Sequence, residues 1–151
     1  MTNIPFNRDL TFDYGRPADL SPFIRRVVAR NPSMFTLHGT GTYIVGRGKV
    51  AIIDPGPNLP EHIDSLLEAV RGETVTDIVI THTHIDHSPA TPPVKAATGA
   101  ITWGFGPHGT PSGTYQVEEG ADHDFVPDHA IGDGDVVSGD GWSLEAIHTP
   151  G

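Results

Sequence analysis

The sequence predicts a layered α/β fold, and three observations support that prediction. β-Branched apolar runs over residues 49–54 and 75–80 each predict a short buried strand. Between these runs, apolar residues recur at helical spacing from residue 58 to 71. A strand, a helix and a strand in this order form a βαβ-like unit, which favours an α/β fold built in layers.

The chain has the size and composition of one globular domain. It has 151 residues with 36% apolar content, and its 18 glycines and 14 prolines predict many turns. It has no cysteine, which excludes disulfides and thiolate ligands. A net charge of −10 disfavours non-specific nucleic-acid binding. With no apolar run near the roughly twenty residues of a membrane span, and no secretory layout at the N-terminus, we expect a soluble cytoplasmic protein without membrane contact.

The first third of the chain is expected to form strands. An edge strand within residues 1–22 is followed by strands over 23–29, 35–45 and 49–54. Residues 35–38 begin the third of these strands, which is interrupted near Gly39. The last two strands flank the glycine turn at 46–48 and predict a β-hairpin.

A helix is expected after the hairpin. Asn58 is the predicted N-cap, Pro60 suits the first turn, and Glu61 complements the helix dipole there. Gly72 lies just past the predicted end, where glycine closes helices readily. After the strand over 75–80, the expected elements are a helix within 88–98, a strand over 100–105, an exposed acidic loop over 106–124 and a closing hairpin from 130–137 and 142–148.

Residues 81–87 are the most informative stretch of the chain. Directly after the strand over 75–80, they place three imidazoles and one carboxylate within six positions: His82, His84, Asp86 and His87. Polar residues at the C-terminal ends of buried strands commonly build sites in α/β sheets. Imidazole nitrogen and carboxylate oxygen suit zinc or another borderline divalent metal. A chance cluster of surface histidines is the alternative, and four ligand types so closely spaced make it improbable.

This stretch resembles the signature of the metallo-β-lactamase-fold hydrolases. Residues 52–56 resemble the family's strand-ending aspartate and glycine turn, and the helix and strand before the signature match its layout. Residues 144–151 resemble the strand that leads into the family's third metal-binding segment. The resemblance covers roughly residues 35–151. It implies that residues 1–151 are the N-terminal part of a single domain, the first half of a four-layer αββα sandwich.

The resemblance implies a role for each residue of the motif. His82 and His84 would bind a first metal ion, and Asp86 and His87 a second, with Asp86 at the catalytic centre. Asp54 would orient the ligand loop by hydrogen bonds; a turn-capping aspartate is the alternative. The expected cofactor is zinc, as two ions in the complete site, with iron or manganese as alternatives.

The resemblance also implies a reaction. In this family a metal-activated hydroxide attacks a carbonyl or phosphorus centre, because zinc lowers the pKa of bound water from about 16 towards 7. The expected function is therefore a metal-dependent hydrolase of an ester, thioester, lactone, lactam or phosphodiester. Two alternatives come from other classes: an iron-dependent oxidoreductase of the same fold, and a non-catalytic metal-binding module.

The C-terminus departs from the family pattern. In the family a ligand histidine follows a Thr-Pro-Gly like that at 149–151, and here the chain ends at Gly151. His148 matches the residue before that tripeptide and is expected to lie on a strand. Each metal would receive two protein ligands, where catalytic zinc usually has three. We therefore expect the remainder of the domain or a second chain to complete the site, with a homodimer as a further alternative, and weak metal binding with little turnover by this polypeptide alone.

The remaining predictions concern the sheet and the other aromatic residues. Half of a sandwich is expected to leave one sheet face uncovered and apolar. His38 and His62 have no partner in sequence and are expected at the surface or in turns. Trp103 and Trp142 lie in apolar strands and are expected in the core. Six residues in or near the acidic loop are expected to be solvated, with a second cation site as the alternative: His108, His123, His129, Asp122, Asp124 and Asp128.

Overall fold

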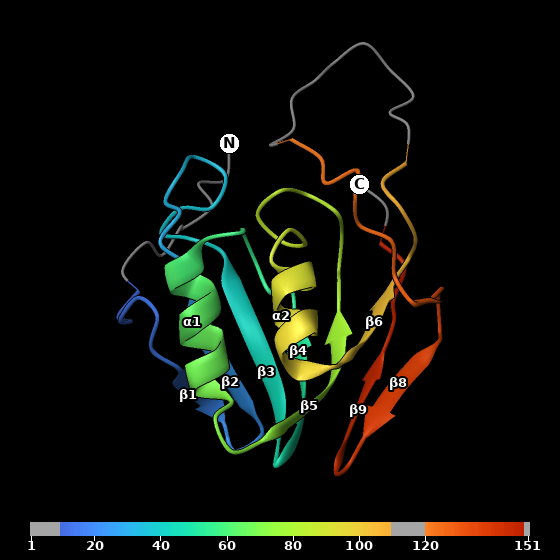
Figure 1. Cartoon of the computed structure of the whole chain (residues 1–151), viewed down its shortest axis with the longest axis horizontal. Coiled ribbons are helices and arrows are strands. Elements are labelled where there is room, and N and C mark those ends of the chain that lie inside the picture. Colours follow the sequence, from blue (N-terminus) through green and yellow to red (C-terminus); the bar gives the residue numbers. More distant parts are fainter. Residues whose placement is uncertain (1–9, 110–119, 150–151) are drawn as a thin grey trace, which may run out of the picture.

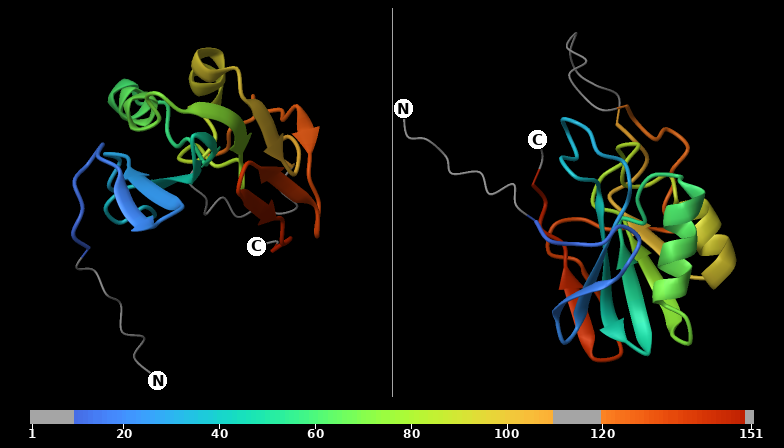
Figure 2. Two further views of the ribbon diagram at one scale, coloured as in Figure 1. Left: turned by 90° about the horizontal axis from the view of Figure 1, so that it is seen from below. Right: turned by 90° about the vertical axis from the view of Figure 1, so that its left-hand side faces the viewer.

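The computed structural model describes residues 10–109 and 120–149. Within these ranges, two helices cover one face of a large sheet and a small hairpin lies on the other side (Figure 1, Figure 2). The large sheet contains β1 (Ala18–Ser21), β2 (Ile24–Val28), β3 (Gly41–Arg47), β4 (Lys49–Ile53), β5 (Thr74–Val79), β6 (Ile101–Gly104) and β7 (His129–Ala130). The helices are α1 (Pro60–Ala69) and α2 (Thr91–Thr98), and the hairpin pairs β8 (Val136–Gly139) with β9 (Trp142–Glu145). Parts of the predicted N-terminal arm and acidic loop, and residues 150–151, lie outside the described ranges.

The strands of the large sheet follow one another in sequence order, but their pairing changes at β4. Strands β1 to β4 are antiparallel neighbours, whereas β4 to β7 pair in parallel. Parallel strands end at the same edge of a sheet, where α/β folds place their sites. The segments that follow β4 and β5 therefore emerge side by side, which brings Asp54 next to the loop that carries the histidines.

The helices bury one face of the sheet. Leu66 of α1 and Val94 of α2 are fully buried against the sheet residues Ile44, Ile52 and Ile78. Helix α1 begins at Pro60, with Leu59 rather than the predicted Asn58 as N-cap, and no side chain caps it. Helix α2 begins at Thr91, so its two prolines fall in the first turn, where proline costs no helical hydrogen bond.

The β8–β9 hairpin covers part of the other face. Trp142 packs with Val45, Ala51 and Val137, and its indole nitrogen donates to the carbonyl of Lys49 at 3.0 Å. The prediction that Trp142 lies in the core is confirmed, and Trp103 packs half-buried against the same cluster. The rest of this face is left uncovered, and Ile24 and Tyr43 on β2 and β3 and Ile101 on β6 are exposed there.

The predicted strand at residues 35–38 is wrong. These residues form a turn, in which the Ser33 side-chain oxygen accepts hydrogen bonds from the amides of Phe35 and Thr36, both at 3.1 Å. Leu37 adopts a left-handed conformation with φ of 57°. A serine that bonds the backbone two and three residues on competes directly with strand pairing, and here it overrides the β-propensity of the sequence.

The fold agrees with the predicted class. The α/β layers, the hairpin before α1 and the strand before the histidine loop are all confirmed. In the described ranges no helix is both long enough and apolar enough to cross a membrane.

Candidate metal centre

The histidine loop follows β5 and is tied at both ends to neighbouring segments. The amide of Ile80 donates to the carbonyl of Trp103 on β6. At the other end, the amide of Gly56 donates to the carbonyl of His87 at 2.8 Å, and the amide of Ala90 donates to the carbonyl of Gly56 at 3.0 Å. The turn after β4 therefore holds the far end of the loop in place through its backbone.

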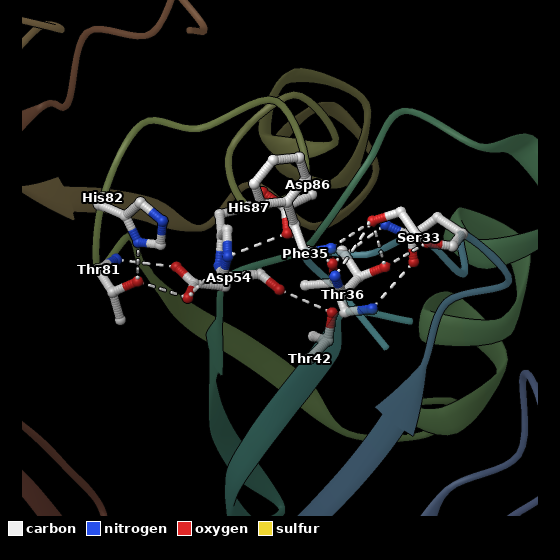
Figure 3. Close-up of polar contacts among 11 residues, drawn as sticks. Ser33, Phe35, Thr36, Thr42, Asp54, Thr81, His82, Asp86 and His87 are labelled. Atoms are coloured by element: carbon white, nitrogen blue, oxygen red, sulfur yellow. Dashed lines mark hydrogen bonds and ion pairs between the residues drawn. The ribbon is translucent and has the colours of Figure 1, made fainter. Parts of the chain in front are cut away.

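Asp54 lies at the centre of this arrangement. Its side chain is buried and accepts three hydrogen bonds: from the Thr81 amide at 2.8 Å, the Thr81 hydroxyl at 2.6 Å and Nδ1 of His87 at 2.9 Å (Figure 3). Its backbone has φ of 49°, a left-handed conformation that aspartate tolerates better than most residues. The predicted orienting role of Asp54 agrees with these contacts.

Asp54 orients the ring of His87. An ionised carboxylate only accepts hydrogen bonds, so Nδ1 of His87 carries the proton that faces Asp54. Nε2 of His87 lies 3.2 Å from Oδ2 of Asp86, a second carboxylate oxygen, so an ion that binds between these two atoms would displace a proton from Nε2. Two donor atoms of the metal-ligand type therefore face each other across a distance that a shared ion would bridge.

The same carboxylate fixes His82 through one intervening hydroxyl. The single hydroxyl proton of Thr81 is donated to Asp54, so Thr81 Oγ1 accepts from Nδ1 of His82 at 3.0 Å. The lone pair of His82 is therefore on Nε2. Burial and the neighbouring His87 lower the pKa of His82, which keeps the ring in the neutral, ligand-competent form.

Two of the predicted ligands, His82 and His87, share one group of possible ligand atoms with Asp54. His84 and Asp86 lie beside that group but outside it. The His82 ring centroid is 4.0 Å from that of His87 and 4.7 Å from that of His84. One ligand atom each from Asp54, His82 and His87 falls within 4.8 Å of the others. That distance admits Asp54 as a ligand, in addition to the hydrogen bonds by which it orients Thr81 and His87. The imidazole and carboxylate donors suit a borderline divalent cation.

Asp86 is held by a segment that the sequence did not connect to the site. The Thr40 hydroxyl donates to Oδ2 of Asp86 at 2.8 Å, and both residues are buried. Asn31 holds Thr40 in turn, since its side chain donates to the Thr40 hydroxyl at 3.1 Å and accepts from the Thr40 amide at 2.9 Å. The loop between β2 and β3 therefore positions a predicted metal ligand.

The acidic loop also contacts the site, so the prediction that its residues are simply solvated is wrong in part. Asp122 accepts a hydrogen bond from the Ser88 hydroxyl at 2.6 Å, and its amide donates to the carbonyl of Thr83. His108 lies 2.8 Å from the Thr83 hydroxyl through Nδ1. These partners are more than twenty residues apart in sequence, and no local pattern indicates them.

His62 is a second correction. It was expected at the surface or in a turn, yet it is 2% exposed beneath the Asp54 turn. Its Nε2 atom lies 3.1 Å from the hydroxyl of Thr42. Burial lowers the pKa of His62 to about 4, while the Pro55 carbonyl and the charge of Glu61 act in the opposite direction.

An apolar pocket opens beside His82. It has a volume of about 540 Å³ and lies between the end of the large sheet and the β8–β9 hairpin. His82 and Thr83 contribute to its polar side. The apolar lining includes Ile53, Val79, Phe105, Phe125, Leu144 and Ile147. His148 stacks on Phe105 in this pocket, after the end of β9 rather than on the strand where it was expected.

Comparison with known proteins agrees with this geometry. The family model described as "Metallo-beta-lactamase superfamily" matches residues 36–151. The chain belongs to the metallo-beta-lactamase superfamily. The resemblance that the histidine motif carries in the sequence is thereby confirmed.

Among sequence relatives in this superfamily, the chain is 35% identical over 135 residues to an atrochrysone carboxyl ACP thioesterase of Aspergillus novofumigatus. It is 36% identical over 137 residues to the beta-lactamase-like protein 2 homolog of Caenorhabditis elegans. Both alignments cover 87% of this chain, and they cover 38% and 43% of the respective relatives. The chain thus spans about two-fifths of the length of the curated relatives it matches.

Solved metallo-beta-lactamases have the same fold. The subclass B3 enzyme MEM-A1, isolated from a soil metagenome library, matches with a TM-score of 0.67 at 21% identity. The subclass B3 enzyme BJP-1 of Bradyrhizobium japonicum matches with a TM-score of 0.64 at 23% identity. These matches cover 92% and 90% of this chain but only 54% and 52% of the two enzymes.

Proposed function

We propose that this chain carries the first metal-binding half of a metal-dependent hydrolase site. His82 and His84 hold one ion, and Asp86 and His87 hold the second. Zinc is the proposed metal, because neutral imidazole and carboxylate suit its preferences. The remaining ligands come from a further part of the domain or from a second chain, since two protein ligands per ion are fewer than catalytic zinc usually has.

The observation that carries this proposal is the orientation of two histidines by one carboxylate. Asp54 accepts from Nδ1 of His87 directly and from Nδ1 of His82 through the Thr81 hydroxyl. Nδ1 of each ring is thereby committed to donating a hydrogen bond, and Nε2 is the ring atom placed to coordinate an ion. Carboxylate–histidine pairs of this kind are typical of metal sites, where they fix the ring and raise its basicity. A solvated histidine loop has no need of such an arrangement.

The chain's own residues prepare the site for hydrolysis. A bound divalent ion supplies Lewis acidity, which brings the pKa of water into the neutral range and so provides a nucleophile. Thr40 keeps the Asp86 carboxylate aimed at the same space as Nε2 of His87. The apolar lining of the pocket beside His82 gives an acyl group a place to bind.

Among the substrates that this chemistry admits, we favour a thioester. The relatives named as acyl-carrier-protein thioesterases, at 35% and 32% identity, support a carbonyl carbon as the centre attacked. A largely apolar pocket of about 540 Å³ suits an acyl chain better than a charged phosphodiester.

Metal content and turnover test the proposal together. Zinc binding is measured by competition with a fluorescent chelator, alongside the release of thiol from acyl thioesters and hydrolysis of ester, lactone, lactam and phosphodiester substrates. We expect saturable zinc binding that is weak in the chain alone and is lost in His87→Ala, and thioester cleavage once the remaining ligands are supplied. Zinc binding unchanged in His87→Ala overturns the assignment. Bound iron without hydrolysis indicates an oxidoreductase, and bound metal with no turnover in the completed site indicates a non-catalytic module.

A further inference from the structure

We propose that His62 is a positioning residue for the metal centre, acting from beneath the turn that carries Asp54. The inference rests on the proposed function of the histidine loop, and it adds a residue outside the predicted ligand set. The role of His62 is to hold the turn that carries Asp54. His62 does so through its contacts with Thr42 and Gly56.

The first connection runs through Thr42. The Thr42 hydroxyl donates to the backbone carbonyl of Asp54 at 2.7 Å and lies 3.1 Å from Nε2 of His62. A hydroxyl has one proton, which goes to Asp54, so at its other contact Thr42 accepts. His62 therefore donates from Nε2. The chain of donors runs from His62 to Thr42 to the Asp54 backbone, and all three residues are buried.

The second connection runs through Gly56. Gly56 has φ of 90°, and a Cβ atom added there would lie 2.9 Å from Nε2 of His62. The imidazole thus occupies the space that any side chain at Gly56 would need. The same glycine donates its amide to the carbonyl of His87 and accepts from the amide of Ala90. A shift of His62 would therefore move Gly56, and with it the amide that bonds the carbonyl of His87.

The presence of histidine at this position is costly for a residue that only fills the core. Its Nδ1 atom is buried and makes no hydrogen bond within the described residues, although the Pro55 carbonyl lies near enough to raise the pKa of the ring. A buried polar atom without a partner destabilises the fold, and leucine in the same space would avoid that cost. Leucine could fill this space but could not donate a hydrogen bond to Thr42, so that bond explains the presence of histidine.

The test compares variants that remove this bond with one that only weakens the core. His62→Leu removes the donor at similar volume, Thr42→Val removes the hydroxyl at nearly constant shape, and His62→Gln restores a donor. Leu66→Ala is the matched control, because Leu66 is equally buried one turn further along α1. For each variant of the full chain, three quantities are measured: zinc affinity by chelator competition, the tautomers of His82 and His87 by ¹⁵N NMR without metal, and stability in urea.

We expect His62→Leu and Thr42→Val to weaken zinc binding roughly 10- to 100-fold, as outer-shell changes do at other metal sites. We also expect them to mix the tautomers of His82 and His87, because the turn that holds Asp54 loses its support. His62→Gln should retain affinity within a few-fold of the wild type. Leu66→Ala should lose stability but keep both the affinity of the folded chain and the tautomers. If His62→Leu is too unstable to study, Thr42→Val carries the test.

Two results overturn the inference. One is that His62→Leu keeps both the zinc affinity and the histidine tautomers of the wild type. If His62→Leu does not fold, the same result in Thr42→Val counts instead. The other is an equal loss of affinity in Leu66→Ala, which would mean that any core change has the same effect. A failure of the proposed function would look different, because the wild-type chain would then bind no zinc. In that case the tautomers measured without metal would still report whether His62 positions the turn.

Discussion

Oδ2 of Asp54 lies 2.9 Å from Nδ1 of His87, although the two residues are 33 positions apart in the sequence. The pair forms because β4 and β5 are parallel neighbours and end at the same edge of the sheet. One carboxylate at the end of β4 therefore orients the histidines that follow β5, before any ligand arrives. The site's geometry depends on the pairing of these two strands.

Replacing Asp54 with asparagine is expected to weaken zinc binding by about 10- to 100-fold. In asparagine an NH2 group replaces one oxygen, so either the Thr81 amide, which bonds Oδ1, or the Thr81 hydroxyl and His87, which both bond Oδ2, lose their acceptor. Chelator competition measures the loss. Asp64→Asn is the control, because it removes the same charge from the exposed side of α1. An equal loss in the control would mean that overall charge, and not orientation, sets the affinity.

Thr40→Val is expected to weaken the binding of one ion more than the other. The substitution removes the donor to Asp86 while keeping the shape of the side chain, and Thr40→Ser keeps the hydroxyl. Titration with cobalt, followed by its absorption spectrum, separates the two binding steps. We expect the valine variant to lose roughly tenfold at one step and the serine variant to stay near the wild type. Identical titrations for valine and wild type would contradict a role for Thr40.

Trp142→Ala is expected to destabilise the fold by about 3–5 kcal/mol, in the range for a buried aromatic residue reduced to alanine. The indole lies against two glycines, and a Cβ atom added at Gly46 would approach it within 2.5 Å. Trp142→Phe keeps most of the packing and loses the hydrogen bond to Lys49, so about 1 kcal/mol should be lost. Urea unfolding gives both values. A phenylalanine variant as unstable as the alanine variant would show that the hydrogen bond, and not packing, holds the hairpin.

The stability of the metal-free chain is expected to fall in acid partly because of His62. Burial lowers the pKa of its ring to about 4 in the folded chain, against about 6.5 when unfolded. As the pH falls, the unfolded state therefore takes up the proton before the folded state does. The contribution of His62 to the free energy of unfolding is fully present above pH 6.5 and is lost as the pH falls towards 4. The free energy of unfolding that is lost in this way amounts to about 3 kcal/mol.

Comparison with His62→Gln isolates this effect from the other titrating groups. Unfolding in urea with a chelator present is measured for both chains at pH 7 and pH 4. The wild type should lose about 3 kcal/mol more than the variant between these two values. Equal losses would place the His62 ring in a site more open to water than its 2% exposure indicates.

Features set by nearby residues could be predicted from the sequence, and features set by distant ones could not. The histidine loop and the strand before it are local patterns, and the structure brings the loop's residues together as expected. His62 was misjudged because its burial depends on Thr42, twenty positions away, and on a glycine turn that leaves room for the ring. Thr40 was missed for the same reason, since it reaches Asp86 across 46 positions.

The errors in secondary structure have local causes that are harder to weigh in advance. Residues 35–38 are apolar or β-branched enough to predict a strand, but Ser33 bonds two of the following amides and closes a turn. At α1, asparagine is the better N-cap by preference, yet the helix begins at Pro60 and leaves Asn58 outside it. Two local signals competed in each case, and propensity alone does not decide between them.

The change of pairing at β4 has a consequence for the order in which the chain assembles. Strands β3 and β4 are joined by the single residue Gly48 and can pair early, whereas β5 joins only after the chain has crossed over through α1. The histidine loop lies beyond that crossover, so its contacts with Asp54 form late. An ion bound there would act after the rate-limiting barrier and would slow unfolding while leaving the folding rate nearly unchanged. Zinc would then lengthen the lifetime of the native chain without guiding its formation.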